Sequence, residues 1–157
     1  MVKIILQDGV EIEASETATF LEIIKGYDKG ILKKAVAVKA NGVVRAWKGL
    51  PSVDGETVRV ELVTLDSKEG LEIYRHSVSH VMAQAVKALY KNVKLAIGPA
   101  IEDGFYYDFD VETPFTPDDL EKIEAQMKGI IKADYPFIGE DMPREGALAL
   151  FRGMGEI

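Results

Sequence analysis

The first 63 residues consist of short apolar or alternating segments separated by glycine turns. Residues 2–7 are mostly apolar, and the Asp8-Gly9 pair that follows is typical of a two-residue hairpin turn. In residues 10–14 apolar and acidic side chains alternate, which predicts a second strand with one face in solvent. Further strands are predicted on both sides of Asn41-Gly42 and after Asp54-Gly55, at residues 35–39, 43–46 and 57–63.

One helix is predicted between the second and third of these strands. The segment SETAT offers helix-start chemistry, and the apolar side chains at 20–24 have helical spacing that ends by Gly26. The order strand, strand, helix and three strands fits a ubiquitin-like β-grasp domain with a small core. Trp47 is expected to cap this core beside Leu50 and Pro51, and the alternative is a stacking platform for a nucleic acid base.

A long amphipathic helix is predicted at residues 69–91, after a polar segment at 64–70 that is the expected linker between two domains. Seven apolar side chains gather on one side of it as a core-facing stripe. They are Leu71, Tyr74, Val78, Val81, Met82, Ala85 and Leu89. The opposite side carries His76, His80, Ala83 and Lys87. The two histidines are therefore expected outside the packed core.

His76 and His80 are the only histidines of the chain and lie one helical turn apart. Such a pair can bind a metal, or can hold and polarise a water molecule for hydrolysis. If another segment covers this face of the helix, the histidines line a cleft and form a site. If the face is open to solvent, the spacing is accidental.

The next segment predicts an antiparallel hairpin. Residues 94–97 are typical of a strand, Gly98-Pro99 of a kink and Asp103-Gly104 of a tight turn, so residues 105–110 are expected to pair back. A hairpin laid over the histidine face of the helix would turn that face into a cleft.

Three side chains of this hairpin, Tyr106, Tyr107 and Asp108, are candidates for the same site. Tyr107 or Asp108 could orient an imidazole or a substrate hydroxyl. The alternative is that Phe105, Tyr107 and Phe109 form an apolar face of the strand while Asp108 lies in water. Ser77 and Ser79 are expected to be helix-surface residues, because neither has an evident acid–base partner.

Two more helices are predicted, which makes the chain α+β. Thr116 before Pro117 and two acids is a well-formed helix start. The buried stripe of that helix is expected at Leu120, Ile123, Met127, Ile130 and Ile131. Phe137-Ile138 is a candidate short strand. Pro143 is expected to open a last helix that carries Leu148, Leu150 and Phe151.

Composition narrows the class of protein. The chain has 157 residues, room for one medium or two small domains, and its 47% hydrophobic and 29% charged residues are ordinary for a soluble globular protein. No apolar run is long enough to span a bilayer, and the charged N-terminus is not a secretory signal. Without cysteine there is neither disulfide nor thiolate ligand, so the cytoplasm is the expected compartment.

The net charge of −7 resides in residues 64–157, since the lysines and arginines of residues 1–63 balance their acids. An acidic second half is poor material for a large, nonspecific phosphate-binding surface. Contacts with nucleic acid are therefore expected to be local, or to depend on further chain.

Three motifs of the second half together resemble threonyl-tRNA synthetases. They are RHSVSHVMAQAV at 75–86, KLAIGPAIEDGFYYDFD at 94–110 and TPDDLEKIE at 116–124. Residues 71–157 resemble the first part of the N-terminal editing domain of that family, and residues 1–63 resemble the TGS domain that precedes it. The run at 96–108 is the most specific motif, because H-x3-H alone also occurs in alanyl-tRNA synthetase editing domains.

The resemblance implies post-transfer editing, in which serine wrongly attached to threonine tRNA is hydrolysed from its ester. Threonine and serine differ by one methyl group, worth only about 1–3 kcal/mol in a pocket, so a single binding step discriminates poorly. A second site that accepts serine and excludes the methyl group of threonine supplies the rest. By resemblance, His76 and His80 position the hydrolytic water and the terminal ribose as catalytic residues. Tyr107 lines the pocket with them, while Tyr106 and Asp108 contact substrate.

The resemblance also implies parts that these 157 residues do not contain. The family completes the editing site with a lysine and a C-x3-H pair, and carries ATP, magnesium and zinc in an aminoacylation core through which it forms homodimers. The chain is therefore expected to be an N-terminal fragment that neither charges tRNA nor edits well alone. Two histidines give a metal only two ligands, so bound zinc is not predicted here.

Two other functions fit the residues. A free-standing, metal-dependent aminoacyl-tRNA deacylase would use the histidines and a nearby carboxylate as zinc ligands. A non-catalytic RNA-binding or regulatory module would act through residues 1–63.

Overall fold

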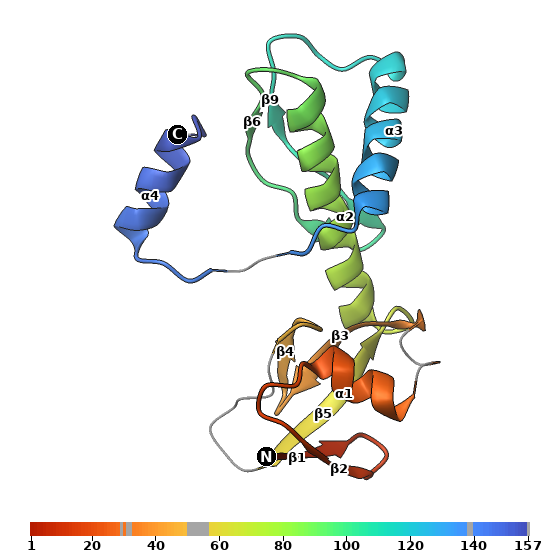
Figure 1. The fold of residues 1–157 in the computed structure, drawn as a ribbon. Coiled ribbons are helices and arrows are strands. Elements are labelled where there is room, and N and C mark those ends of the chain that lie inside the picture. The colour runs from red at the N-terminus through yellow and green to blue at the C-terminus, as the bar shows by residue number, and fades with distance from the viewer. Residues whose placement is uncertain (29, 31–32, 50–56, 138–139, 157) are drawn as a thin grey trace. The chain divides into compact units, whose positions relative to one another are not determined.

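The computed structural model describes residues 1–28, 30, 33–49, 57–137 and 140–156. The chain divides into two compact units, Met1–Tyr74 and Arg75–Ile157. The boundary between the units falls inside the long helix α2 (Lys68–Leu89). Both units contain strands and helices (Figure 1). The predicted α+β class is confirmed.

A five-stranded mixed sheet in the order β2-β1-β5-β3-β4 forms the first unit (Figure 1). Its strands are β1 (Val2–Leu6), β2 (Glu11–Ala14), β3 (Ala35–Ala40), β4 (Val43–Arg45) and β5 (Thr57–Thr64). β1 and β5 pair in parallel, and the other neighbours are antiparallel. All five strands predicted from alternation are confirmed, with small differences at their ends.

Two of the predicted hairpin turns are present. Gly9 has a φ of 85°, and Asn41 and Gly42 have φ values of 48° and 82°, the left-handed backbone that these residue types tolerate. The third predicted turn, Asp54-Gly55, lies outside the described residues, as do Leu50 and Pro51.

Helix α1 (Phe20–Tyr27) begins at a capping box and packs on the sheet. The backbone N–H of Thr19 donates to Glu22 Oε2 at 2.8 Å, and the Glu22 N–H donates to Thr19 Oγ1 at 3.3 Å. Phe20 and Ile24 lie in a core shared with buried side chains of β1, β3 and β5. Trp47 is half-buried against this core, as predicted.

Helix α2 starts within the segment 64–70 that was predicted as a linker. Ser67 Oγ donates to the Thr64 carbonyl at 2.7 Å and accepts from the Gly70 N–H at 3.0 Å. Lys39 Nζ pairs with Glu69 at 2.6 Å. These contacts hold the start of the helix against the sheet of the first unit.

The buried face of α2 differs from the predicted stripe. Ser79, expected at the surface, and Ala83, expected beside the histidines, are both buried, so both predictions are wrong. Leu71, Tyr74 and Leu89, expected in the core, are exposed. For Ser79, Ala83 and Leu89 the reason is that the second unit packs the hairpin and helix α3 (Pro117–Ala133) against a face rotated from the most apolar one.

The hairpin pairs in two sections. β6 (Lys94–Leu95) pairs with β9 (Phe109–Asp110), and two bonds continue this section: Ala96 N–H donates to the Asp108 carbonyl at 3.0 Å and Asp108 N–H donates to the Ile97 carbonyl at 2.8 Å. After Gly98-Pro99, β7 (Ala100–Ile101) pairs with β8 (Gly104–Phe105). The tight turn is therefore Glu102-Asp103, one residue earlier than predicted, because Gly104 already pairs with Ile101.

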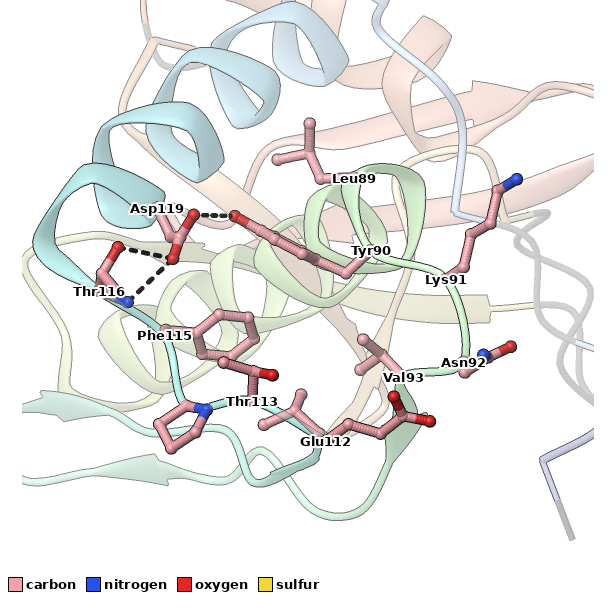
Figure 2. Close-up of a pocket in the computed structure, with 12 residues that line it drawn as sticks. Leu89, Tyr90, Lys91, Asn92, Val93, Glu112, Thr113, Phe115, Thr116 and Asp119 are labelled. Atoms are coloured by element: carbon pink, nitrogen blue, oxygen red, sulfur yellow. Dashed lines mark hydrogen bonds between the residues drawn. The ribbon is translucent and has the colours of Figure 1, made fainter.

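Helix α3 begins at Thr116 as predicted, and its first turn is linked to the end of α2. Asp119 accepts hydrogen bonds from the Thr116 N–H and hydroxyl at 2.9 and 2.7 Å and from the Tyr90 hydroxyl at 2.9 Å (Figure 2). These residues line a cavity of about 350 Å3 at the junction of the two helices. The Asp119 carboxylate is therefore both a helix cap and an interhelical link.

The apolar stripe of α3 is narrower than predicted. Ile123 and Ile130 are buried and Met127 is half-buried, whereas Leu120 and Ile131 are 61% and 60% exposed. Leu120 and Ile131 were predicted in the core, and this is wrong. Ile123, Met127 and Ile130, spaced i, i+4 and i+7, are the apolar residues of α3 that pack against α2 and the hairpin. Leu120 and Ile131 lie beside this line and remain exposed.

The last described helix is α4 (Arg144–Gly153), which begins after Pro143 as predicted. It buries none of its residues: Leu148 is half-buried, and Leu150 and Phe151 are exposed. Phe137 lies in no strand, and Ile138 is outside the described residues.

Candidate functional site

The two histidine rings of α2 contact each other on an exposed face. The Nε2 atoms of His76 and His80 are 3.1 Å apart, and the rings meet edge to face with centroids 4.5 Å apart. A single hydrogen between the two nitrogens makes one ring the donor and the other the acceptor. Both residues are exposed, so the pair is accessible to a substrate.

The protein around His80 favours the neutral form of its imidazole. Partial burial, and secondly the charge of His76, lower the pKa of His80 below the ordinary value for histidine. A neutral imidazole at physiological pH can accept a hydrogen bond or a proton from water. The electrostatics therefore suit a group that positions or activates a water molecule.

Two polar contacts fasten the hairpin beside the histidines. Arg75 Nη1 donates to the carbonyls of Ile101 and Glu102 at 3.1 and 2.5 Å. Ser79 Oγ lies 2.7 Å from the His76 carbonyl and 3.0 Å from the Gly98 carbonyl, to which it can donate. Because Arg75 and Ser79 each precede a histidine by one residue, the hairpin runs along the neighbouring face of the helix.

Tyr107 is tied to this contact through Gly98. A methyl group at Gly98 would lie 2.0 Å from Tyr107 Cδ2, so the tyrosine ring occupies the space that a side chain would need. The ring also stacks on Phe109, with centroids 4.9 Å apart. Tyr107 is therefore half-buried beside Gly98. The carbonyl oxygen of Gly98 in turn lies next to the Ser79 hydroxyl.

The predicted site residues are not all brought together. Among the described residues, no hydrogen bond or ring contact joins Tyr106, Tyr107 or Asp108 to either histidine. Tyr106 and Asp108 are exposed. The stacking of Tyr107 on Phe109, with Asp108 in water, matches the apolar strand face that was the alternative for these residues.

Ser79 is a structural link that sequence reasoning missed. It was read as a surface residue because it lacks a catalytic partner, whereas its hydroxyl is buried and joins the hairpin to the helix. Ser79, Ala83 and Val86 follow helical spacing with small side chains at the first two positions. That pattern could have indicated a face where another segment approaches closely.

An apolar groove lies next to the histidines. The ring of Phe137 is 6.5 Å from that of His80 and is itself exposed. Phe137, Tyr135, Val81, Ile130 and Ile131 are among the residues that line a cavity of about 340 Å3. One side of the histidine pair is therefore bordered by apolar surface.

Two negative findings apply to the described ranges alone. No group of three or more histidine, aspartate or glutamate side chains there could hold a metal ion. No helix there combines the length and apolar character needed to cross a membrane.

Comparison with known proteins identifies relatives for the whole chain. The threonine–tRNA ligase of Desulforamulus reducens is 48% identical over 157 residues, which are 100% of this chain and 24% of the ligase. The corresponding ligases of Citrifermentans bemidjiense and Anaeromyxobacter dehalogenans are 46% and 47% identical over 99% of the chain. The chain matches the N-terminal region of threonine–tRNA ligases.

The resemblance to threonyl-tRNA synthetases is thus confirmed. The chain spans about 24% of the length of these threonine–tRNA ligases. A comparison with models of protein families finds no match.

Proposed function

We propose that this chain is the TGS domain and the first part of the editing domain of a threonine–tRNA ligase. The whole enzyme attaches threonine to its tRNA with ATP, and this region serves tRNA binding and the hydrolysis of mischarged seryl-tRNA. The observation that carries the proposal is the 48% identity to a threonine–tRNA ligase across all 157 residues. The exposed, mutually contacting histidines support it.

The proposed domains are a ubiquitin-like β-grasp TGS domain at 1–63, a linker at 64–70 and a truncated editing domain at 71–157. The parallel pairing of β1 with β5, between antiparallel neighbours, supports the β-grasp assignment. The separation into compact units near residue 74 supports a second domain that begins on α2.

The proposed reaction is the hydrolysis of the seryl ester on the terminal ribose of the tRNA. Water adds to the ester carbonyl carbon, the bond from that carbon to the ribose oxygen breaks, and the ribose hydroxyl leaves with a proton while serine is released. His80, whose lowered pKa favours the neutral imidazole, holds the water and accepts a hydrogen bond from it. His76, whose Nε2 lies 3.1 Å from the Nε2 of His80, positions the ribose hydroxyl.

Roles for the hairpin residues follow from their exposure. Tyr107 forms part of the pocket wall through its position at the hairpin kink, and Tyr106 and Asp108 are exposed and free to contact substrate. These roles require substrate, or further protein, to bridge the hairpin and the histidines. No cofactor or metal is assigned to this chain.

The remaining assignments concern the whole ligase. ATP, magnesium and zinc would act in its aminoacylation core, threonine tRNA would be its partner, and it would form a homodimer through that core in the cytoplasm. The identity of the relatives as threonine–tRNA ligases supports these proposals.

Deacylation of serine-charged threonine tRNA tests the proposal. The full-length protein that carries this region should release serine, and His76→Ala and His80→Ala should slow the release by about 100-fold or more, the range for loss of an acid–base group. Glu72→Ala is a matched control, because Glu72 is an exposed residue of the same helix. The 157-residue chain alone should show little activity.

Wild-type rates in both histidine variants would contradict the editing role. Stoichiometric zinc in the purified protein that is lost in His76→Ala would favour a metal-dependent deacylase instead. If all affinity for threonine tRNA resides in residues 1–63 and the histidine variants change nothing, the chain acts as an RNA-binding module.

A further inference from the structure

The first unit has an apolar groove that the proposed editing function does not use. It lies between strand β2 and helix α1, with a volume of about 490 Å3. Ile12, Ala14, Ala18 and Ile23 supply its apolar lining, and Glu13, Glu22, Gly26 and Tyr27 complete it. The Tyr27 hydroxyl is held there by the carboxylate of Asp8.

The groove runs beside a strand with an open edge. In the described sheet β2 is terminal and pairs only with β1, so its outward N–H and carbonyl groups can pair with an additional strand. An extended peptide that added to this edge would place alternate side chains on the two faces of the sheet.

The two faces of β2 differ in chemistry. Ile12 and Ala14 pair with the buried β1 residues Ile4 and Val2 and face α1 and the groove. Glu11 and Glu13 alternate with them and face the other way. Glu11 is paired with Lys3 at 2.7 Å, whereas Glu13 has no ion pair among the described residues.

The charged residues around the groove determine whether a cationic or an anionic ligand is attracted to it. Five carboxylates and no lysine or arginine lie between Lys3 and Lys25 in the sequence. The acids are Asp8, Glu11, Glu13, Glu16 and Glu22. Glu11 and Glu16 are paired with Lys3 and with the N-terminal ammonium, which leaves the charges of Asp8, Glu13 and Glu22. This remaining charge repels phosphates and attracts cationic side chains, so a polypeptide fits this surface better than RNA does.

We propose that the β2–α1 groove docks an extended peptide segment of a partner protein in which apolar and basic residues alternate. The segment adds to β2 as a sixth strand. Its apolar side chains enter the groove against Ile12 and Ile23, and its basic side chains lie beside Glu13 on the opposite face. β2 has four residues, so the docking segment is short.

A peptide titration of the 157-residue chain followed by amide NMR tests this proposal. The probe is a capped Lys-Val-Lys-Val-Lys-Val-Lys peptide, and a Glu-Val-Glu-Val-Glu-Val-Glu peptide is the charge control. The basic peptide should shift amides of β2 and of residues 18–27, and the acidic peptide should not. Glu13→Lys should weaken binding by about fivefold, the size of one exposed ion pair.

Gly26→Leu tests the groove separately from the charge. A Cβ atom at Gly26 would meet no other group within 4 Å, and Gly26 lines the groove, so the variant should fold while the leucine narrows the groove and weakens binding. Glu121→Lys, an exposed position on α3, is the control for net charge and should bind as the wild type does. The folding of every variant is checked by its amide spectrum.

Three results would overturn the proposal. One is the absence of β2 shifts at millimolar peptide. Another is equal binding of the basic peptide by wild type, Glu13→Lys and Gly26→Leu. The third is a shift of the β2 amides by RNA or by self-association alone, which would assign the surface to a different occupant.

Discussion

The hydroxyl of Ser79 lies 3.0 Å from the carbonyl oxygen of Gly98, and through this contact the hairpin is held beside the histidine turn of α2. Ser79 is fully buried, and the Tyr107 ring fills the space that a side chain at Gly98 would occupy. The position of Tyr106, Tyr107 and Asp108 relative to the histidines thus depends on this contact together with that of Arg75.

Ser79→Ala should destabilise the second unit. The Gly98 carbonyl loses its hydroxyl donor, which costs about 1–3 kcal/mol of the free energy of unfolding when the acceptor is shielded from water. Urea unfolding measures the loss, and faster hydrogen exchange of the Asp108 amide should accompany it. Thr113→Ala removes an exposed hydroxyl that has no hydrogen bond in the described structure and should be nearly neutral. Equal losses in both variants would show that the Ser79 contact is unimportant.

Gly98→Ala should displace Tyr107. The added methyl group would lie 2.0 Å from the ring, so the ring must leave its stack on Phe109, at a cost of about 1–3 kcal/mol. Aromatic proton NMR of Tyr107 reports the movement. Gly104→Ala is the matched control on the same hairpin, because a side chain there meets nothing within 4 Å. An unchanged Tyr107 spectrum in Gly98→Ala would contradict the predicted packing.

Gly70→Ala and Gly129→Ala should have opposite effects although both glycines are helical. At Gly70 the methyl group would lie 1.9 Å from the Thr64 carbonyl oxygen, so the start of α2 must shift, at a cost of about 1–3 kcal/mol. At Gly129 it meets nothing within 4 Å, and the higher helix propensity of alanine should add up to about 1 kcal/mol. Thermal unfolding compares the two variants. A Gly70→Ala protein as stable as the wild type would refute the close approach.

Asp119 should make stability depend on acidic pH. Its hydrogen bonds from Thr116, then from Lys122 and Tyr90, hold the pKa of Asp119 well below its usual range. A depressed pKa in the folded state means that the stabilisation is complete above the unfolded value of about 3.9 and is lost as pH falls below it. Asp119→Asn should lower the melting temperature by several degrees at pH 7 and flatten this acid dependence. Asp118→Asn, at an exposed position in the same helical turn, is the control and should change the melting temperature at pH 7 little.

His80 should titrate below the ordinary histidine range. Burial is the larger cause of its lowered pKa, so His76→Gln should raise the pKa of His80 only part of the way to about 6.5. Because the folded pKa is the lower one, the unfolded chain binds a proton first, and stability falls as pH drops from about 6.5 toward the folded value. Imidazole NMR of the two histidines measures both pKa values. If the pKa of His80 rose all the way to about 6.5 in His76→Gln, the charge of His76 would be the main cause of the lowered value.

Local chemistry predicted the helix starts and hairpin turns well. The Thr19–Glu22 capping box, the Asp8-Gly9 and Asn41-Gly42 turns and the helix start at Thr116 all occur as expected. Each involves residues within a few positions of one another. The backbone conformation and hydrogen bonds of these motifs therefore follow from the amino acids themselves.

The sequence by itself determined the elements of this protein, their order and its similarity to threonine–tRNA ligases. Only the tertiary structure decided which faces of these elements are buried. Ser79 and Ala83 are covered and Leu120 and Ile131 are left in solvent, although apolar periodicity favours the reverse for three of these four residues. The physical reason is that burial depends on which distant segment packs against a helix. On α2 that segment is a hairpin held by Arg75 and Ser79 through backbone carbonyls, contacts that no helical pattern encodes.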